Sequence, residues 1–260
     1  MKNILLILVT SYLFIVLAMY LLQRHLLYFP TSVPGKLNHE VITIESDDLK
    51  VKVVVSNTHY DKAVIYFGGN GENVYNSVSA MEDAFTDHAV YFVNYPGYGG
   101  SSGTPSEVTI NQAANDVYAY VSKKHQSVAL VGRSLGTGVA FNLASKHRVS
   151  HLILISPYDS IASVANTHYP FLPNSWLIKD RFDSESRADN VSGHILILIA
   201  EQDNVIPIKH SMKLKSAIEQ NRNAQASKLR LESRLYKLSD HNNVHLHPEF
   251  MQDIRRFLQH

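Results

Sequence analysis

The chain has 260 residues, of which 45% are hydrophobic and 18% are charged, and its formal net charge is +1. This length fits one large domain or two small ones, and the composition fits a globular protein with a substantial core. A net charge so close to zero gives no indication of nucleic-acid binding. The lack of cysteine excludes disulfides, thiolate metal sites and a cysteine nucleophile. The 14 histidines form no H-E-x-x-H motif, so we expect no metal and no cofactor.

The N-terminal segment is the most apolar part of the chain. Residues 3–23 carry no charged side chain and are bounded by Lys2 and Arg24. A helix rises about 1.5 Å per residue, so this stretch can cross a hydrocarbon core of about 30 Å. We therefore expect residues 1–25 to be an uncleaved, single-pass membrane anchor. Two alternatives stay open: a signal peptide, which usually has a shorter apolar core and a small-residue cleavage site, and a core helix, which is usually amphipathic. Lysine and arginine are balanced across the segment and favour neither orientation.

Residues 26–260 are expected to form one domain. It begins with a predicted hairpin of two strands, 40–45 and 49–55, at the edge of a sheet. From residue 62 onwards, short apolar strands alternate with helices. The predicted strands are 63–67, 89–93, 128–131, 151–155, 195–199 and 229–238, and the predicted helices are 74–85, 109–125, one starting near 207, and 247–258. This order predicts an α/β fold with a mostly parallel central sheet and helices on both faces.

One connection interrupts this alternation. Nearly forty residues lie between the strand that ends at 155 and the strand that starts at 195, and they include Tyr169, Phe171 and Trp176. Long connections in compact domains are often active-site lids, so residues 160–190 are predicted to be a lid or cap insertion. An alternative, compatible with the first, is an extra helix packed on the sheet with these aromatic rings in the core.

A serine motif organises the centre of the chain. Residues 132–136 read Gly-Arg-Ser-Leu-Gly, directly after an apolar strand and directly before a helical stretch. Strand, sharp turn with a serine at its apex and helix form the arrangement called a nucleophile elbow, in which small residues on both sides allow the tight turn. The pattern alone is common, but this context favours Ser134 as a nucleophile over an inert turn.

A serine nucleophile needs a base and an acid that orients the base. In open α/β sheets such groups follow the carboxyl ends of strands. Asp203 follows the strand 195–199 and is the predicted acid, with Asp159 and Glu201 as rivals. Its alternative role is that of a cap or turn residue before the helix that starts near 207. His241 lies in a polar turn directly after the last strand and is the predicted base.

His245 and His247 lie close to His241 in the sequence, and each would more often be a surface histidine. The developing oxyanion needs two backbone N–H groups. One is expected from Leu135, next to the nucleophile, and the other from Asn70 in the glycine-rich loop 68–71. A phosphate-binding loop is the competing interpretation, but the P-loop lysine and the G-x-G-x-x-G pattern are both missing.

Together these features resemble the α/β-hydrolase superfamily, and within it the membrane-anchored BEM46-like serine hydrolases of the ABHD12, ABHD13 and ABHD17 types. The resemblance runs from about residue 26 to the C-terminus. The residues that carry it are 69–73 (Gly-Asn-Gly-Glu-Asn), 94–107 (starting Asn-Tyr-Pro-Gly-Tyr-Gly), 132–138, 179–184 and 241–242. The chain departs from the group at Gly68, where a histidine is usual, and at Ala200, where a glycine is usual.

The resemblance implies an α/β-hydrolase fold and esterase, thioesterase or lipid-hydrolase activity. We therefore expect a membrane-bound serine hydrolase that acts on a small-molecule or lipid acyl substrate, with Tyr98, Tyr169, Phe171 and Trp176 contacting that substrate. Two other classes stay open. A peptidase or amidase could use the same three residues, and a non-catalytic binding protein could share the fold.

Overall fold

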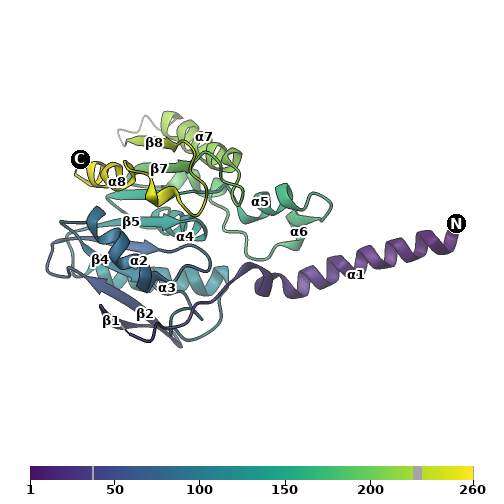
Figure 1. Ribbon diagram of the computed structural model, residues 1–260, viewed down its shortest axis with the longest axis horizontal. Helices are drawn as coiled ribbons and strands as arrows, with labels where there is room; N and C mark the ends of the chain where they lie inside the picture. Colours follow the sequence, from purple (N-terminus) through teal and green to yellow (C-terminus); the bar gives the residue numbers. More distant parts are fainter. Residues whose placement is uncertain (37, 225–229, 260) are drawn as a thin grey trace.

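The computed structural model describes residues 1–36, 38–224 and 230–259 (Figure 1). One eight-stranded sheet lies at its centre, with the order β1-β2-β4-β3-β5-β6-β7-β8. The pairs β1–β2 and β2–β4 are antiparallel, and all other neighbours are parallel. The strands are β1 (Glu40–Ser46), β2 (Leu49–Ser56), β3 (Lys62–Phe67), β4 (Ala89–Val93), β5 (Ser127–Arg133), β6 (His151–Ile155), β7 (His194–Ala200) and β8 (Leu231–Tyr236).

One N-terminal helix projects from the domain, and most of the other helices lie against the two faces of this sheet. The helices are α1 (Lys2–Leu27), α2 (Val74–Met81), α3 (Glu107–Ser122), α4 (Leu135–Ala144), α5 (Ile161–His168), α6 (Asn174–Leu177), α7 (Ile208–Ala224) and α8 (Phe250–Leu258), with short 3₁₀ turns at Glu82–Ala84, Glu185–Asn190 and Val244–Leu246. Apolar side chains of α3, α4 and α7 pack on one face, and those of α2 and α8 pack on the other. The central strands β3 to β7 are buried from both sides, which explains their nearly continuous apolar sequences.

The predicted sheet is confirmed, and the differences are at the ends of elements. The helix predicted for 109–125 starts earlier, because the Ser106 side chain caps it in a reciprocal pair with Thr109. The last helix starts at Phe250 rather than 247, because Pro248 disfavours helical backbone at His247, which is extended. The strand predicted for 229–238 runs from Leu231 to Tyr236, and Leu229 lies outside the described residues.

The N-terminal helix α1 projects from the body of the molecule (Figure 1). Its most apolar stretch is 0% buried, which contradicts the core-helix alternative, and it is long and apolar enough to cross a membrane. The segment predicted to be a lid carries α5 and α6, on the side of the body from which α1 projects. Tyr169, Phe171 and Trp176 in this segment are 50%, 65% and 87% exposed, so they are surface residues rather than core residues.

Candidate active site

Ser134 lies between β5 and α4, at the apex of a sharp turn. Its φ is +51°, a backbone conformation that side-chain-bearing residues rarely adopt. A Cβ at Gly132 would lie 2.3 Å from the carbonyl oxygen of Gly136, and one at Gly136 would lie 2.0 Å from that of Phe67. Both flanking glycines are therefore required by backbone contacts, as the elbow motif predicts.

Three side chains meet at the carboxyl ends of β5, β7 and β8. His241 Nε2 lies 2.9 Å from Ser134 Oγ, and His241 Nδ1 lies 2.7 Å from Asp203 Oδ2. Ser134 and His241 are each 9% exposed and Asp203 is 7% exposed. Hydrogen bonds of this length between largely desolvated groups hold the imidazole in one orientation. Residues separated by more than 100 positions in the sequence thus form one connected chain of hydrogen bonds.

The two carboxylate oxygens of Asp203 have different partners. Oδ2 faces His241, while Oδ1 accepts hydrogen bonds from the N–H groups of Val205 and Ile206 at 2.9 and 2.7 Å. The turn-forming role that was the alternative for Asp203 is therefore present alongside the contact with His241. The backbone bonds also fix the direction in which the carboxylate points.

The rival residues have other partners. Asp159 is fully buried, and its two oxygens lie 2.8 Å from His210 Nδ1 and 2.9 Å from Lys213 Nζ. Glu201 accepts a hydrogen bond from the N–H of Leu238 on the surface. The ring of His247 lies 4.6 Å from that of Tyr236. His245 is a neighbour of Arg133, and burial together with the Arg133 charge lowers its pKa.

The glycine-rich loop after β3 lies against Ser134. A Cβ at Gly69 would be 3.5 Å from the Ser134 Cβ, and the Gly69 N–H donates to Glu72 Oε2 at 2.7 Å. The Gly69 amide is thus occupied. Within the described part of the chain, the Asn70 N–H takes part in no backbone hydrogen bond. Leu135 is the first residue of α4, where N–H groups have no partner inside the helix.

The Asn70 side chain is held by Tyr98 and by residues at the C-terminal end of α1 and just after it. Its Nδ2 donates to the carbonyl oxygen of Leu27, and its Oδ1 accepts from the N–H of Phe29 at 3.1 Å and from the Tyr98 hydroxyl at 2.8 Å. Tyr98 itself is only 2% exposed. The structure therefore places Tyr98 beneath the loop, whereas it was expected to contact substrate.

Sequence reasoning also missed the ion pair between Arg133 and Glu72. Arg133 Nη1 lies 2.9 Å from Glu72 Oε2, and Arg133 Nη2 donates to the carbonyl oxygen of His241 at 3.3 Å. Burial alone would raise the pKa of Glu72, but the Arg133 charge and hydrogen bonds from Ser77 and the Gly69 amide lower it. One buried carboxylate therefore connects the elbow, the glycine-rich loop and, through Arg133, the His241 turn.

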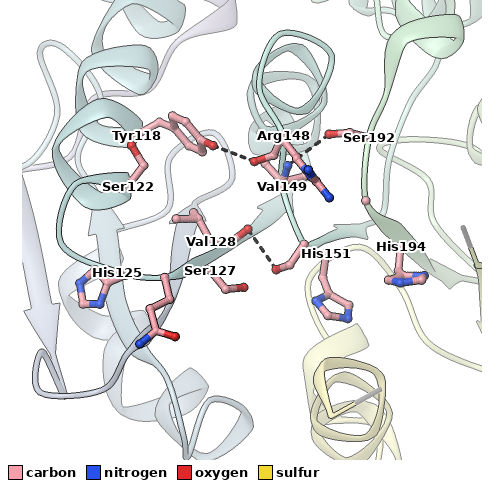
Figure 2. Close-up of a pocket in the computed structure, with 13 residues that line it drawn as sticks. Tyr118, Ser122, His125, Ser127, Val128, Arg148, Val149, His151, Ser192 and His194 are labelled. Carbon is pink, nitrogen blue, oxygen red and sulfur yellow. Dashed lines mark hydrogen bonds between the residues drawn. The ribbon is translucent and has the colours of Figure 1, made fainter.

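A separate cavity lies at the opposite ends of the strands, away from Ser134 (Figure 2). This cavity of about 820 Å³ is lined by residues at the amino ends of β5, β6 and β7, among them Ser127, His151 and His194, and by Tyr118 of α3. Ligands of open α/β sheets bind at the carboxyl ends of strands, so this cavity is not the candidate site. Within the described residues, no group of three His, Asp or Glu side chains could hold a metal ion.

Comparison with known proteins agrees with this fold. The model of the family described as the alpha/beta hydrolase fold matches residues 62–192. The chain belongs to the α/β-hydrolase family. An uncharacterized protein of Mycobacterium tuberculosis is 30% identical over 214 residues, which are 75% of each chain. The resemblance to ABHD12-type proteins is also confirmed: the lysophosphatidylserine lipase ABHD12 of Danio rerio is 32% identical over 162 residues.

This α/β-hydrolase spans about half the length of the ABHD12 relatives, since its match covers 42% of the Danio rerio protein and 48% of that of Bos taurus. Two solved structures share its fold. The Pyrococcus furiosus esterase Pf2001 superposes with a TM-score of 0.69 at 14% identity, covering 89% of this chain and 98% of that one. Est1E from Butyrivibrio proteoclasticus, with ferulic acid bound, superposes with a TM-score of 0.67 at 16% identity, covering 84% and 98%. The chain is a hydrolase, and its relatives include esterases and lipases.

Proposed function

We propose that this protein is a membrane-anchored serine hydrolase that cleaves carboxylic esters or thioesters of acyl or lipid substrates. Ser134 is the nucleophile, His241 the base and Asp203 the residue that orients the base. The observation that carries the proposal is the chain of hydrogen bonds from Ser134 Oγ through both ring nitrogens of His241 to Asp203. Nucleophile, base and orienting acid in this contact order are what acyl transfer by a serine requires.

In the proposed reaction, the Ser134 oxygen attacks the acyl carbonyl carbon while its proton moves to His241 Nε2. The tetrahedral intermediate then collapses, the bond to the leaving alcohol or thiol breaks, and His241 returns the proton to that leaving group. A water molecule attacks the acyl-enzyme, again losing its proton to His241. The acid leaves and Ser134 regains its proton. Asp203 stabilises the imidazolium formed in each half of the cycle.

The amides of Leu135 and Asn70 are proposed to bind the oxyanion. The helix start at Leu135 and the occupied Gly69 amide support this pair. A preorganised donor of this kind contributes roughly 3–4 kcal/mol to the transition state. Tyr98, from its buried position under Asn70, is then a positioning residue. It holds the loop together with the Phe29 N–H, which donates to the Tyr98 hydroxyl at 3.0 Å.

Labelling with a fluorophosphonate probe tests the nucleophile. Wild-type protein should be labelled, and both Ser134→Ala and His241→Ala should lose the label, because the probe reports an activated serine. Ser156 provides a matched control: it is also buried, follows a strand and has a positive φ of 49°, but its hydroxyl has no hydrogen-bond partner among the described residues. Ser156→Ala should keep the label. Undiminished labelling of Ser134→Ala would refute the proposed nucleophile.

The substrate class rests on the candidate membrane helix, the exposed aromatic residues and the lipases among the relatives. Rates on matched esters of increasing acyl length test it, with a lysophospholipid as one substrate and an amide of the same acyl group as the comparison. Preference for long acyl esters is expected. A clear preference for acetyl esters would contradict the lipid assignment, and faster hydrolysis of the amide would favour a peptidase or amidase.

A further inference from the structure

The segment from residue 169 to 178, which contains α6, lies along α1. The Tyr12 hydroxyl donates to the carbonyl oxygen of Phe171 at 2.9 Å, and Gln23 Nε2 donates to that of Leu177 at 3.0 Å. Tyr12 and Gln23 are eleven residues apart on one helix. At 1.5 Å per residue, the contact therefore extends for about 16 Å along α1.

Both segments lack charged side chains, and the charged residues that directly follow each of them contact one another. Residues 160–178 contain no Asp, Glu, Lys or Arg, as is also true of residues 3–23. At the boundary, Arg24 forms a two-point ion pair with Asp180, with Nε–Oδ2 and Nη2–Oδ1 distances of 2.9 and 3.1 Å. The neighbouring Lys179 places its Nζ 3.9 Å from the centre of the Tyr20 ring. Charged and aromatic side chains of this kind mark a membrane–water interface.

From these contacts we infer that residues 169–178 are inserted, together with α1, into the leaflet nearest the catalytic domain. With Arg24 at the interface, Phe171 lies at the depth of Tyr12, about one leaflet, or half of a 30 Å hydrocarbon core. The bilayer is the partner that matches the surface, because Phe171 and Trp176 are 65% and 87% exposed and their neighbours on α1 are exposed apolar residues.

Most backbone N–H groups of this segment have a hydrogen-bond partner, among them those of Leu172, Trp176 and Leu177. Irregular backbone is tolerated at membrane depth only where its polar groups are satisfied. Besides the bonds from Tyr12 and Gln23, the carbonyl oxygen of Tyr169 accepts from Asn174 Nδ2 at 2.7 Å, and the Lys179 N–H donates to Gln23 Oε1 at 2.7 Å. Pro170 and Pro173 carry no N–H at all.

An apolar groove of about 300 Å³ lies between the two segments. Leu13, Val16, Leu17 and Tyr20 line it from α1, and Pro173, Trp176 and Leu177 line it from the other side. In the inserted state this groove opens to the acyl chains of the leaflet. Because the groove is lined by apolar side chains and faces acyl chains, we expect it to bind a lipid chain.

Trp176 is the only tryptophan of the chain, so its fluorescence reports the position of this segment directly. Full-length protein is reconstituted in phosphatidylcholine vesicles, with and without bromine on the acyl chains. Brominated lipid should quench the emission, and aqueous iodide should not. Trp176→Phe combined with Phe171→Trp should be quenched best by bromines nearer the bilayer centre.

Trp176→Phe combined with Lys123→Trp is the matched control, because Lys123 is an exposed residue at the far end of α3. Its emission should be quenched by iodide and not by brominated lipid. The inference rests on the membrane anchoring in the proposed function, so flotation of the vesicles is measured first. Protein that does not float with the vesicles, or that floats with Trp176 open to iodide, overturns the inference. Fluorophosphonate labelling in the same vesicles tests the proposed chemistry separately.

Discussion

Replacing Glu72 by alanine tests whether the buried ion pair holds the site together. The Glu72 carboxylate accepts hydrogen bonds from Arg133, the Gly69 amide, and the Tyr66 and Ser77 hydroxyls, at distances from 2.6 to 2.9 Å. Its side chain is 9% exposed and that of Arg133 is 20% exposed. Glu72→Ala leaves the Arg133 charge in this site without a counter-charge.

Removing one partner of a buried pair costs about 3–5 kcal/mol. In a domain of this size, each kcal/mol shifts Tm by roughly 2–4 °C, so Glu72→Ala should lower Tm by roughly 6–20 °C. Thermal unfolding of the full chain in detergent measures this shift. Glu201→Ala is the matched control, because Glu201 is exposed and accepts a single backbone hydrogen bond, and its Tm should stay near that of wild type.

Two further measurements sharpen the test. Adding Arg133→Met to Glu72→Ala removes the stranded charge, so the double variant should unfold at a higher temperature than Glu72→Ala alone. The lowered pKa of Glu72 means that its contribution is present above the ordinary glutamate pKa and is lost as pH falls through the folded-state value. The Tm gap between wild type and Glu72→Ala should therefore narrow in acid. A Glu72→Ala protein with wild-type Tm at pH 7 would refute the reasoning.

Three other changes give separate tests. Asp203→Asn should lower kcat on a soluble ester by roughly 10⁴-fold with little change in Tm, because an amide favours the wrong His241 tautomer; a loss below tenfold would argue against the orienting role. Gly136→Ala should prevent folding, because its Cβ meets backbone, whereas Gly35→Ala, with nothing within 4 Å, should match wild type in Tm and solubility. Burial, more than the neighbouring charges, lowers the pKa of His151 to about 4. Below pH 6.5 the unfolded chain therefore binds a proton at His151 that the folded chain does not, and stability falls as pH is lowered towards 4. The His151→Leu variant should lose less stability over this pH range. A Tm–pH curve with the same acid side as wild type would contradict the prediction.

The sheet and the predicted nucleophile, acid and base could be read from the sequence because each has a local signal. Short apolar runs mark the strands, and the elbow motif marks Ser134. Asp203 and His241 stand in polar turns directly after strands, and parallel strands bring their carboxyl ends to one edge. Only the chain order and the strand assignments were needed to expect these side chains together.

The contacts around these residues have no such signal. Glu72 and Arg133 lie 61 positions apart, and their pairing depends on how the loop after β3 folds over the elbow. The nearest local sign is a charged residue at the second position of an otherwise uncharged Gly-Arg-Ser-Leu-Gly motif. The burial of Tyr98 could not be predicted either. The sequence of a glycine-rich loop does not indicate whether the hydroxyl of its tyrosine is exposed to solvent or bonded to Asn70.

The junction after α1 links the anchor to the candidate site. The Tyr28 hydroxyl donates to Asp180 Oδ2 at 3.1 Å, and the residues on either side of Tyr28, Leu27 and Phe29, hold the Asn70 side chain. One short stretch thus contacts both the proposed oxyanion loop and Asp180, two residues beyond the proposed membrane-inserted segment. A flexible linker would let the domain tumble above the bilayer, whereas side-chain contacts on both sides of one residue fix its orientation. In the proposed enzyme, the height and direction of Ser134 relative to the membrane are therefore set by the fold itself.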